Sequence, residues 1–205
     1  MKNLIVSVAL LFSVPAASTT LADVQRSLAA TSSMTADFTQ TASSGGVARG
    51  KVSIKRPGKI RFDYGKGATF LVVADGRTLS FIDYQVRQVS QWPIRSTPLG
   101  VLLDPSSDLA RVAKLLPADQ SPVPGTVAVL ATDPKRPEIG KILILFEPDT
   151  AAPGGLRLAG WRVTDAQNNL TVVTLSNPVW NVPVSDVAFR FDDPRRRAGP
   201  SGKGN

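Results

Sequence analysis

The stretch Gly50-Lys-Val-Ser-Ile-Lys-Arg-Pro-Gly-Lys-Ile-Arg-Phe-Asp-Tyr64 decides the fold that we expect for this chain. On both sides of Pro57-Gly58, apolar residues alternate with polar ones, and the apolar members are Val52, Ile54, Ile60, Phe62 and Tyr64. Such alternation is typical of strands with one buried and one solvent-facing side. Proline cannot donate to a strand ladder, so Pro57 belongs at a bend or an edge. The stretch therefore predicts an antiparallel hairpin. It is either an ordinary hairpin or one in which Arg56, held at the bend, has a functional partner.

Similar segments extend this prediction to a large antiparallel sheet. The segment 141–146 is apolar at every second position and also between those positions, so both faces of the sheet must be covered there. Asp75-Gly76 predicts a tight hairpin turn. Short connections favour neighbouring antiparallel strands, about nine to eleven in total. The other strand-like segments are 34–41, 70–74, 78–83, 85–92, 126–131, 156–163, 170–175 and 187–191.

Three segments have helical spacing instead. Asp23–Ala30 predicts a short N-terminal helix with Asp23 as its cap. Thr97-Pro98 precedes Leu99–Leu103, as at a helix start, and 109–116 repeats the spacing. The last two helices either connect strands at the end of the sheet or form a lid over an apolar cavity.

The N-terminus has the pattern of a signal peptide. Lys2 precedes an apolar core over 4–14 and a small-residue region over 15–22. Cleavage after Ala22 fits this pattern, and cleavage after Ser18 is a second possibility; an uncleaved membrane anchor is the competing interpretation. We expect a signal peptide over 1–22, one domain over 23–192 and a basic, disordered tail over 193–205. No cysteine that could be acylated follows the apolar core, so we expect an exported protein that is soluble outside the cytoplasm.

Composition excludes several classes of function. The 205 residues contain no Cys and no His, which excludes disulfides, thiol nucleophiles, Ser-His-Asp triads and His-based metal sites. No Ser-x-x-Lys spacing occurs, which argues against a Ser-Lys hydrolase. We therefore expect no catalytic activity, no cofactor and no metal. The net charge of +8 favours anionic membrane surfaces or acidic proteins as partners. Export argues against nucleic acid.

The chain resembles the outer-membrane lipoprotein carrier protein family (LolA) over nearly all of the region that follows the predicted signal peptide. Four motifs carry the resemblance in the family's order: 34–40, then Lys55-Arg-Pro-Gly-Lys-Ile-Arg-Phe-Asp-Tyr64 after Gly50, then 73–79, and 97–103. The resemblance implies a mainly β fold, an incomplete, unclosed antiparallel β-barrel with a small α-helical lid and an N-terminal helix. It also implies a periplasmic chaperone that takes acylated lipoproteins from an inner-membrane ABC transporter to an outer-membrane receptor.

The resemblance further implies a role for the opening stretch. Arg56, next to Pro57, would hydrogen-bond the lid in the closed state and be displaced when lipid enters. The alternative function is a lipid- or lipoprotein-sensing periplasmic regulator on the same fold. We expect a monomer in either case. The candidates for residues that line the cavity are Ile54, Ile60, Phe62, Phe70, Phe81, Leu99, Leu102, Leu103 and Leu145.

Overall fold

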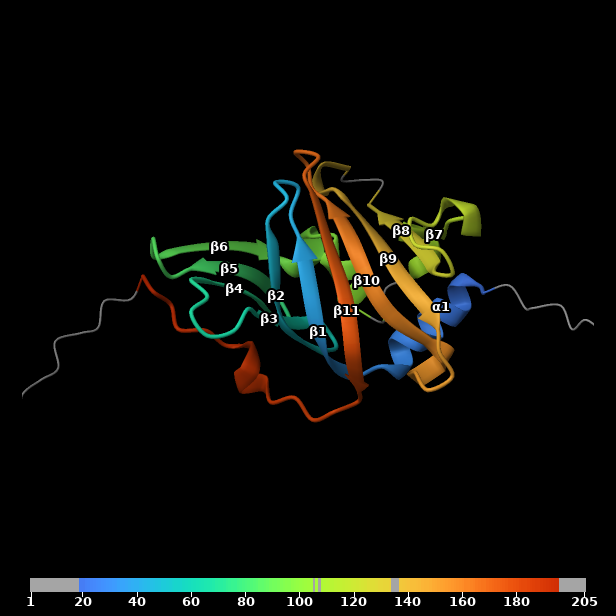
Figure 1. The fold of residues 1–205 in the computed structure, drawn as a ribbon, viewed down its shortest axis with the longest axis horizontal. Coiled ribbons are helices and arrows are strands. Elements are labelled where there is room, and N and C mark those ends of the chain that lie inside the picture. Colours follow the sequence, from blue (N-terminus) through green and yellow to red (C-terminus); the bar gives the residue numbers. More distant parts are fainter. Residues whose placement is uncertain (1–18, 105, 107, 134–136, 196–205) are drawn as a thin grey trace, which may run out of the picture.

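A computed structural model describes residues 19–104, 106, 108–133 and 137–195. Its main feature is one antiparallel sheet of eleven strands in the order β6-β5-β4-β3-β2-β1-β11-β10-β9-β8-β7 (Figure 1). The first strand pairs with the last in the middle of the sheet, and the edge strands β6 and β7 are not joined, so the predicted unclosed barrel is confirmed. The strands are β1 Ser33–Thr41, β2 Val47–Lys55, β3 Lys59–Asp63, β4 Phe70–Asp75, β5 Thr78–Asp83, β6 Gln88–Pro93, β7 Ala113–Leu115, β8 Val127–Thr132, β9 Lys141–Pro148, β10 Leu156–Thr164 and β11 Leu170–Trp180.

The predicted hairpin is β2 and β3. Val52 pairs with Phe62, and Ile54 with Ile60, so these four residues share one face. All four are buried, and burial of each such side chain contributes about 1.5–3 kcal/mol. We call this the inner face of the sheet.

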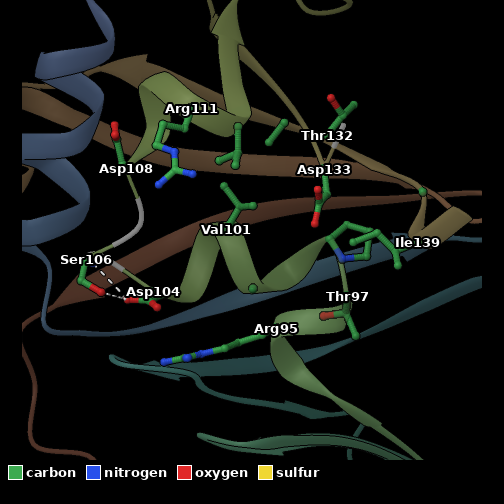
Figure 2. Close-up of a pocket in the computed structure, with 15 residues that line it drawn as sticks. Arg95, Thr97, Val101, Asp104, Ser106, Asp108, Arg111, Thr132, Asp133 and Ile139 are labelled. Atoms are coloured by element: carbon green, nitrogen blue, oxygen red, sulfur yellow. Dashed lines mark hydrogen bonds between the residues drawn. The ribbon is translucent and has the colours of Figure 1, made fainter. Parts of the chain in front are cut away.

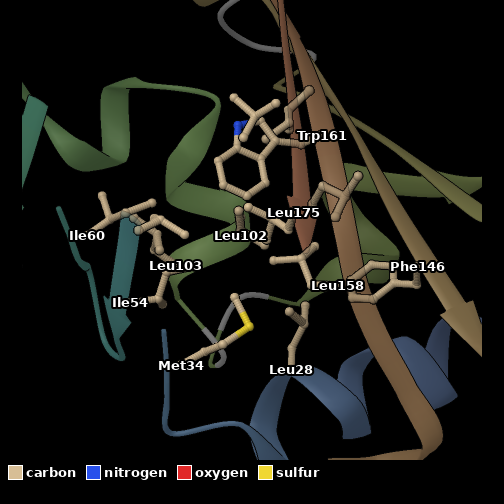
Figure 3. Packing of buried hydrophobic residues seen from close by; sticks show 14 of the residues in the cluster. Leu28, Met34, Ile54, Ile60, Leu102, Leu103, Phe146, Leu158, Trp161 and Leu175 are labelled. Carbon is tan, nitrogen blue, oxygen red and sulfur yellow. The ribbon is translucent and has the colours of Figure 1, made fainter. Parts of the chain in front are cut away.

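The inner face carries the main hydrophobic cluster, which we call the central cluster (Figure 3). Every strand except the edge strand β6 contributes to it, because alternate residues of each strand point inward. Its largest fully buried members include Trp161, Phe146, Met34, Leu102 and Leu103.

Helix α1, Leu21–Ala30, packs into this cluster through Val24 and Leu28. Its cap is Thr20, whose side chain accepts from the Asp23 backbone N–H, while the Asp23 carboxylate accepts from the Thr20 N–H. The prediction that Asp23 caps the helix was therefore wrong by one turn, because Asp23 occupies the third helical position of a capping box. Most of the predicted signal peptide lies outside the described residues. Among the described residues, no helix is long and apolar enough to span a membrane.

The chain crosses from one sheet edge to the other between β6 and β7. This crossing contains η1 (Ile94–Ser96), α2 (Leu99–Leu103) and α3 (Leu109–Val112), and we call α2 the lid helix. The helix expected over 109–116 was too long: after Val112 the chain forms β7, in which Ala113 pairs with Ala131 and Leu115 with Val129. In the strand Ala113 and Leu115 face the central cluster, whereas the helical spacing rests on Leu109, Val112 and Leu116. The short 3-10 turns η2 (Ala118–Gln120), η3 (Pro137–Ile139) and η4 (Pro153–Gly155) lie in later loops.

The chain after β11, residues 181–195, covers the outer face of β3 to β5, and we call it the C-terminal segment. The strand expected over 187–191 was wrong: Asp186–Phe189 forms the 3-10 turn η5, capped by the Ser185 side chain, which accepts from the Val187 N–H. Arg61 donates to the carbonyls of Ala188 and Arg190, which holds the segment to the sheet. Under it lies a second hydrophobic cluster built on Leu71, Val73, Ile82 and Phe189.

Candidate functional site

The bend at Arg56 to Gly58 meets the ends of two helices. The Arg56 Nη1 donates to the Thr31 carbonyl at the end of α1, at 2.6 Å. Its Nε and Nη2 both lie 3.4 Å from the Leu102 carbonyl in the lid helix. One guanidinium therefore bridges α1 and α2, as its fork of donors allows.

This placement follows from the chemistry of helix ends. The last carbonyls of a helix have no partner within the helix, and their partial negative charge attracts cations. Burial lowers the pKa of Arg56 to about 10, so the side chain remains charged at neutral pH. The carbonyls of Thr31 and Leu102 are the acceptors that compensate for this burial.

Gly58 makes a second connection that the sequence reasoning did not assign. Its backbone N–H donates to the Leu103 carbonyl at 3.0 Å, so the bend also holds the end of the lid helix by a main-chain bond. Gly58 has φ +76°, and a Cβ there would lie 2.7 Å from the Gly76 carbonyl oxygen. Glycine at position 58 therefore lets the bend pack against the β4–β5 turn while its N–H bonds the lid helix. The Pro57-Gly58 pair was the available signal, but it indicated only a turn.

The underside of the lid helix fills the inside of the sheet. Leu102 and Leu103 have no exposed surface, and Figure 3 shows them among Ile54, Ile60 and Trp161. Leu99 is half-buried against the same cluster. Six predicted cavity residues therefore meet around the lid helix: Ile54, Ile60, Phe62, Leu99, Leu102 and Leu103. An acyl chain that entered here would have to displace the two lid leucines.

A row of aromatic rings runs from this cluster along β3, β4 and β5 to the partly exposed Phe81. Phe62 stacks at 6.3 Å from Tyr64, Tyr64 lies 4.3 Å from Phe70, and Phe70 lies 6.0 Å from Phe81, measured between ring centroids. Burial raises the pKa of Tyr64, whose hydroxyl donates to Gln40 Oε1. Phe81 is 37% exposed. Phe70 and Phe81 alternate along their strands with Leu71 and Ile82, which face outward, so both rings lie on the inner face. They are less buried than the lid leucines.

Leu145 lies elsewhere, so its assignment to the cavity was wrong. On β9, Ile142, Ile144 and Phe146 face the central cluster, whereas Leu145 packs with Ala128 and Ala159 on the outer face. A strand that is apolar on both faces does not reveal which alternate set faces inward. The pairing of Ile144 with Val129 determines it.

The lid helix also borders a pocket of about 560 Å³, shown in Figure 2. Val101 projects into it from α2, and Arg111 and Thr132 reach it from α3 and the end of β8. Gly100 and Val101 line the pocket, and Val101 also packs against the edge of the central cluster, in which Leu102 and Leu103 are fully buried. Open space therefore lies along one side of the lid helix. The helix could move into this space.

The arrangement suits apolar binding. Among the described residues, no group of three or more His, Cys, Asp or Glu side chains could hold a metal ion. What the site offers is a fully buried apolar surface, closed by a helix that a few hydrogen bonds hold in place.

Comparison with known proteins gives the same family for most of the chain. The family model for the outer membrane lipoprotein carrier protein LolA matches residues 29–192. An outer-membrane lipoprotein carrier protein of Chromobacterium violaceum is 28% identical over 88% of this chain and 87% of its own length. One of Cupriavidus necator is 30% identical over 78% and 77%. Among solved structures, a LolA superfamily protein of Nitrosomonas europaea has a TM-score of 0.47 and 12% identity, with 85% of this chain and 99% of that chain covered.

Proposed function

The chain belongs to the outer-membrane lipoprotein carrier (LolA) family, and from this membership we propose that it binds the acyl chains of lipoproteins beneath its lid helix. It would take them from an inner-membrane ABC transporter and deliver them to an outer-membrane receptor. It would act as a monomer in the periplasm, without enzymatic activity.

The observation that carries this proposal is the complete burial of Leu102 and Leu103, which lie on the underside of the lid helix. Only a few hydrogen bonds, from Arg56 and Gly58, join this helix to the bend. Exposing two leucines costs about 3–6 kcal/mol, so the empty protein stays closed. An acyl chain that takes their place restores the lost apolar contacts. The lid leucines and the acyl chain are therefore competitors for one surface.

This competition gives the carrier a workable affinity. A lipoprotein's acyl chains leave a membrane at a cost of about 0.8 kcal/mol per methylene, which reaches tens of kcal/mol for several chains. The carrier must offer a comparable apolar surface. The energy that returns when the lid helix closes favours release to the receptor.

Crosslinking in living cells tests the proposal. A photoreactive amino acid replaces Leu103, and in a control it replaces Val187, which is 65% exposed on the C-terminal segment. We expect acylated lipoproteins to crosslink at position 103 and not at 187. Crosslinks at 103 to a protein without acyl chains would support a sensing role instead, and equal crosslinking at both positions would refute the proposed site.

A further inference from the structure

A single row of residues crosses the outer face of the sheet from β2 to β7. Each member pairs directly with the next in the strand register, so their side chains lie side by side on one face. The row is Val47, Thr41, Val172, Arg162, Leu143, Leu130 and Lys114. It lies near the β1–β2 and β10–β11 turns, at the upper end of the sheet in Figure 1.

The neighbouring rows continue the pattern. Toward the turns, Leu170 pairs with Thr164, Thr164 with Lys141, and Lys141 with Thr132. On the other side, Arg49 pairs with Thr39, and Thr39 with Thr174. These paired positions contain four basic residues and no acidic one. We call the basic members together with Val47, Leu130, Leu143, Leu170 and Val172 the outer-face patch; its basic members are Arg49, Lys114, Lys141 and Arg162.

The patch is partly open to solvent, since Leu130, Leu143, Arg162 and Val172 are half-buried. Lys114, Lys141 and Arg49 are exposed, and Val47 and Leu170 are 53% and 39% exposed. The Nε of Arg162 is buried and has no hydrogen-bond partner among the described residues. The C-terminal segment covers a different part of the outer face, over β3 to β5.

We propose that the outer-face patch binds the surface of an anionic phospholipid bilayer. Phosphate groups would pair with the basic side chains, and the aliphatic side chains between them would enter the headgroup region. This proposal rests on the proposed function only in that a carrier must visit membranes.

The mixture of residues favours a lipid surface over an acidic protein. Lys and Arg place their charges in the headgroup layer while their aliphatic stems lie along apolar surface. The apolar side chains of the patch, of which Val47 and Leu170 are exposed and the others half-buried, have no charge to offer an acidic protein. Docking by the outer face would also leave the lid helix, on the inner face, directed away from the lipid. Cargo would then reach a receptor protein without direct loss to the bilayer.

The expected effect can be calculated per charge. A Lys or Arg near an anionic bilayer contributes about fivefold in binding, which salt reduces. Removing Lys114 and Lys141 should therefore weaken binding about 25-fold. Both side chains are exposed, so Lys114→Gln with Lys141→Gln should fold normally.

The test is flotation of the purified protein, in the form found in the periplasm, with vesicles of pure phosphatidylcholine or of phosphatidylglycerol mixed into phosphatidylcholine. We expect salt-sensitive binding to the anionic vesicles only, and its loss in the double variant. The control is Lys66→Gln with Arg77→Gln, which removes the same charge from two exposed loop positions outside the patch.

Equal weakening in both double variants would mean that net charge alone drives binding, and would overturn the proposal. So would the absence of any binding to anionic vesicles. If the patch variant instead lost delivery to the receptor without any vesicle binding by the unchanged protein, the surface would belong to a protein partner. None of these results requires cargo in the cavity, so failure here is distinct from failure of the carrier proposal.

Discussion

Replacing Arg56 by leucine removes the side-chain connection between α1 and the lid helix. A hydrogen bond from a charged donor contributes about 1.5–3 kcal/mol, and the two bonds to the Leu102 carbonyl are long, so we count them as one. The equilibrium between closed and open lid should therefore shift about 10- to 150-fold toward the open state. The Gly58 bond to Leu103 remains and keeps part of the closed population.

The assay is a titration with a fluorescent fatty acid, followed by release of bound lipoprotein to the receptor. Arg56→Leu should bind the probe more tightly, because less of the binding energy is spent on opening the lid. Release of cargo should slow, because closure returns less energy. Arg56→Lys keeps the charge but not the fork of donors, so it should lie between the two. A probe affinity within twofold of the unchanged protein, together with unchanged release, would refute the latch.

Three further predictions concern the lid, the C-terminal segment and the N-terminus. Leu103→Asp removes one of the two side chains that compete with the acyl chain, so it should favour the open lid and tighten probe binding at least about tenfold. Val101→Asp, at the edge of the central cluster and beside the pocket, should change binding less. Melting curves show whether each variant is folded, and unchanged or weaker binding by a folded Leu103→Asp variant would mean that the lid leucines do not compete with the acyl chain. Hydrogen bonds from Lys55 and Lys59 lower the pKa of Asp186 to about 2. The stability that this carboxylate gives the folded protein is therefore present above its ordinary pKa and is lost as pH falls through about 2. An NMR titration should show this, and Lys55→Gln with Lys59→Gln should return the pKa toward 3.8. Mass spectrometry of the exported protein should find Thr19 at the N-terminus, because cleavage after Ala22 would remove the Thr20 cap of α1, worth about 1 kcal/mol; an N-terminus at Asp23 would contradict this.

The hairpin could be predicted because its information is local. Val52, Ile54, Ile60 and Phe62 alternate with polar residues on both sides of one bend, and period-two alternation has one interpretation when the other face is polar. Leu145 shows the limit of this reasoning. On β9 both alternate sets are apolar, and only pairing with β8 shows which set faces inward.

The contacts of the lid depend on residues far apart in the chain. Leu102 and Leu103 could be predicted as apolar helix positions. The Gly58 N–H bond to the Leu103 carbonyl joins backbone atoms, which leave no mark in residue type. The segment after Leu109 has apolar residues that fit either a helix or a strand, and the free edge of β8 selects the strand.

The outer-face patch is the clearest case of information that exists only in three dimensions. Lys114, Arg162 and Val47 come from different thirds of the chain, and six strand pairings bring them into one row. No local window of sequence contains that row. The net charge of the chain indicated anionic partners but not where they would bind.

Native mass spectrometry tests the central claim, that the space filled by Leu102 and Leu103 receives acyl chains, most directly. The protein is isolated from the periplasm of cells that produce one lipoprotein, either acylated or with its acylated cysteine replaced by serine. We predict a complex with the acylated form only, and its loss when Ile60→Asp places a carboxylate on the sheet surface that the lid leucines cover. A complex of equal abundance with the form that lacks acyl chains would contradict the account.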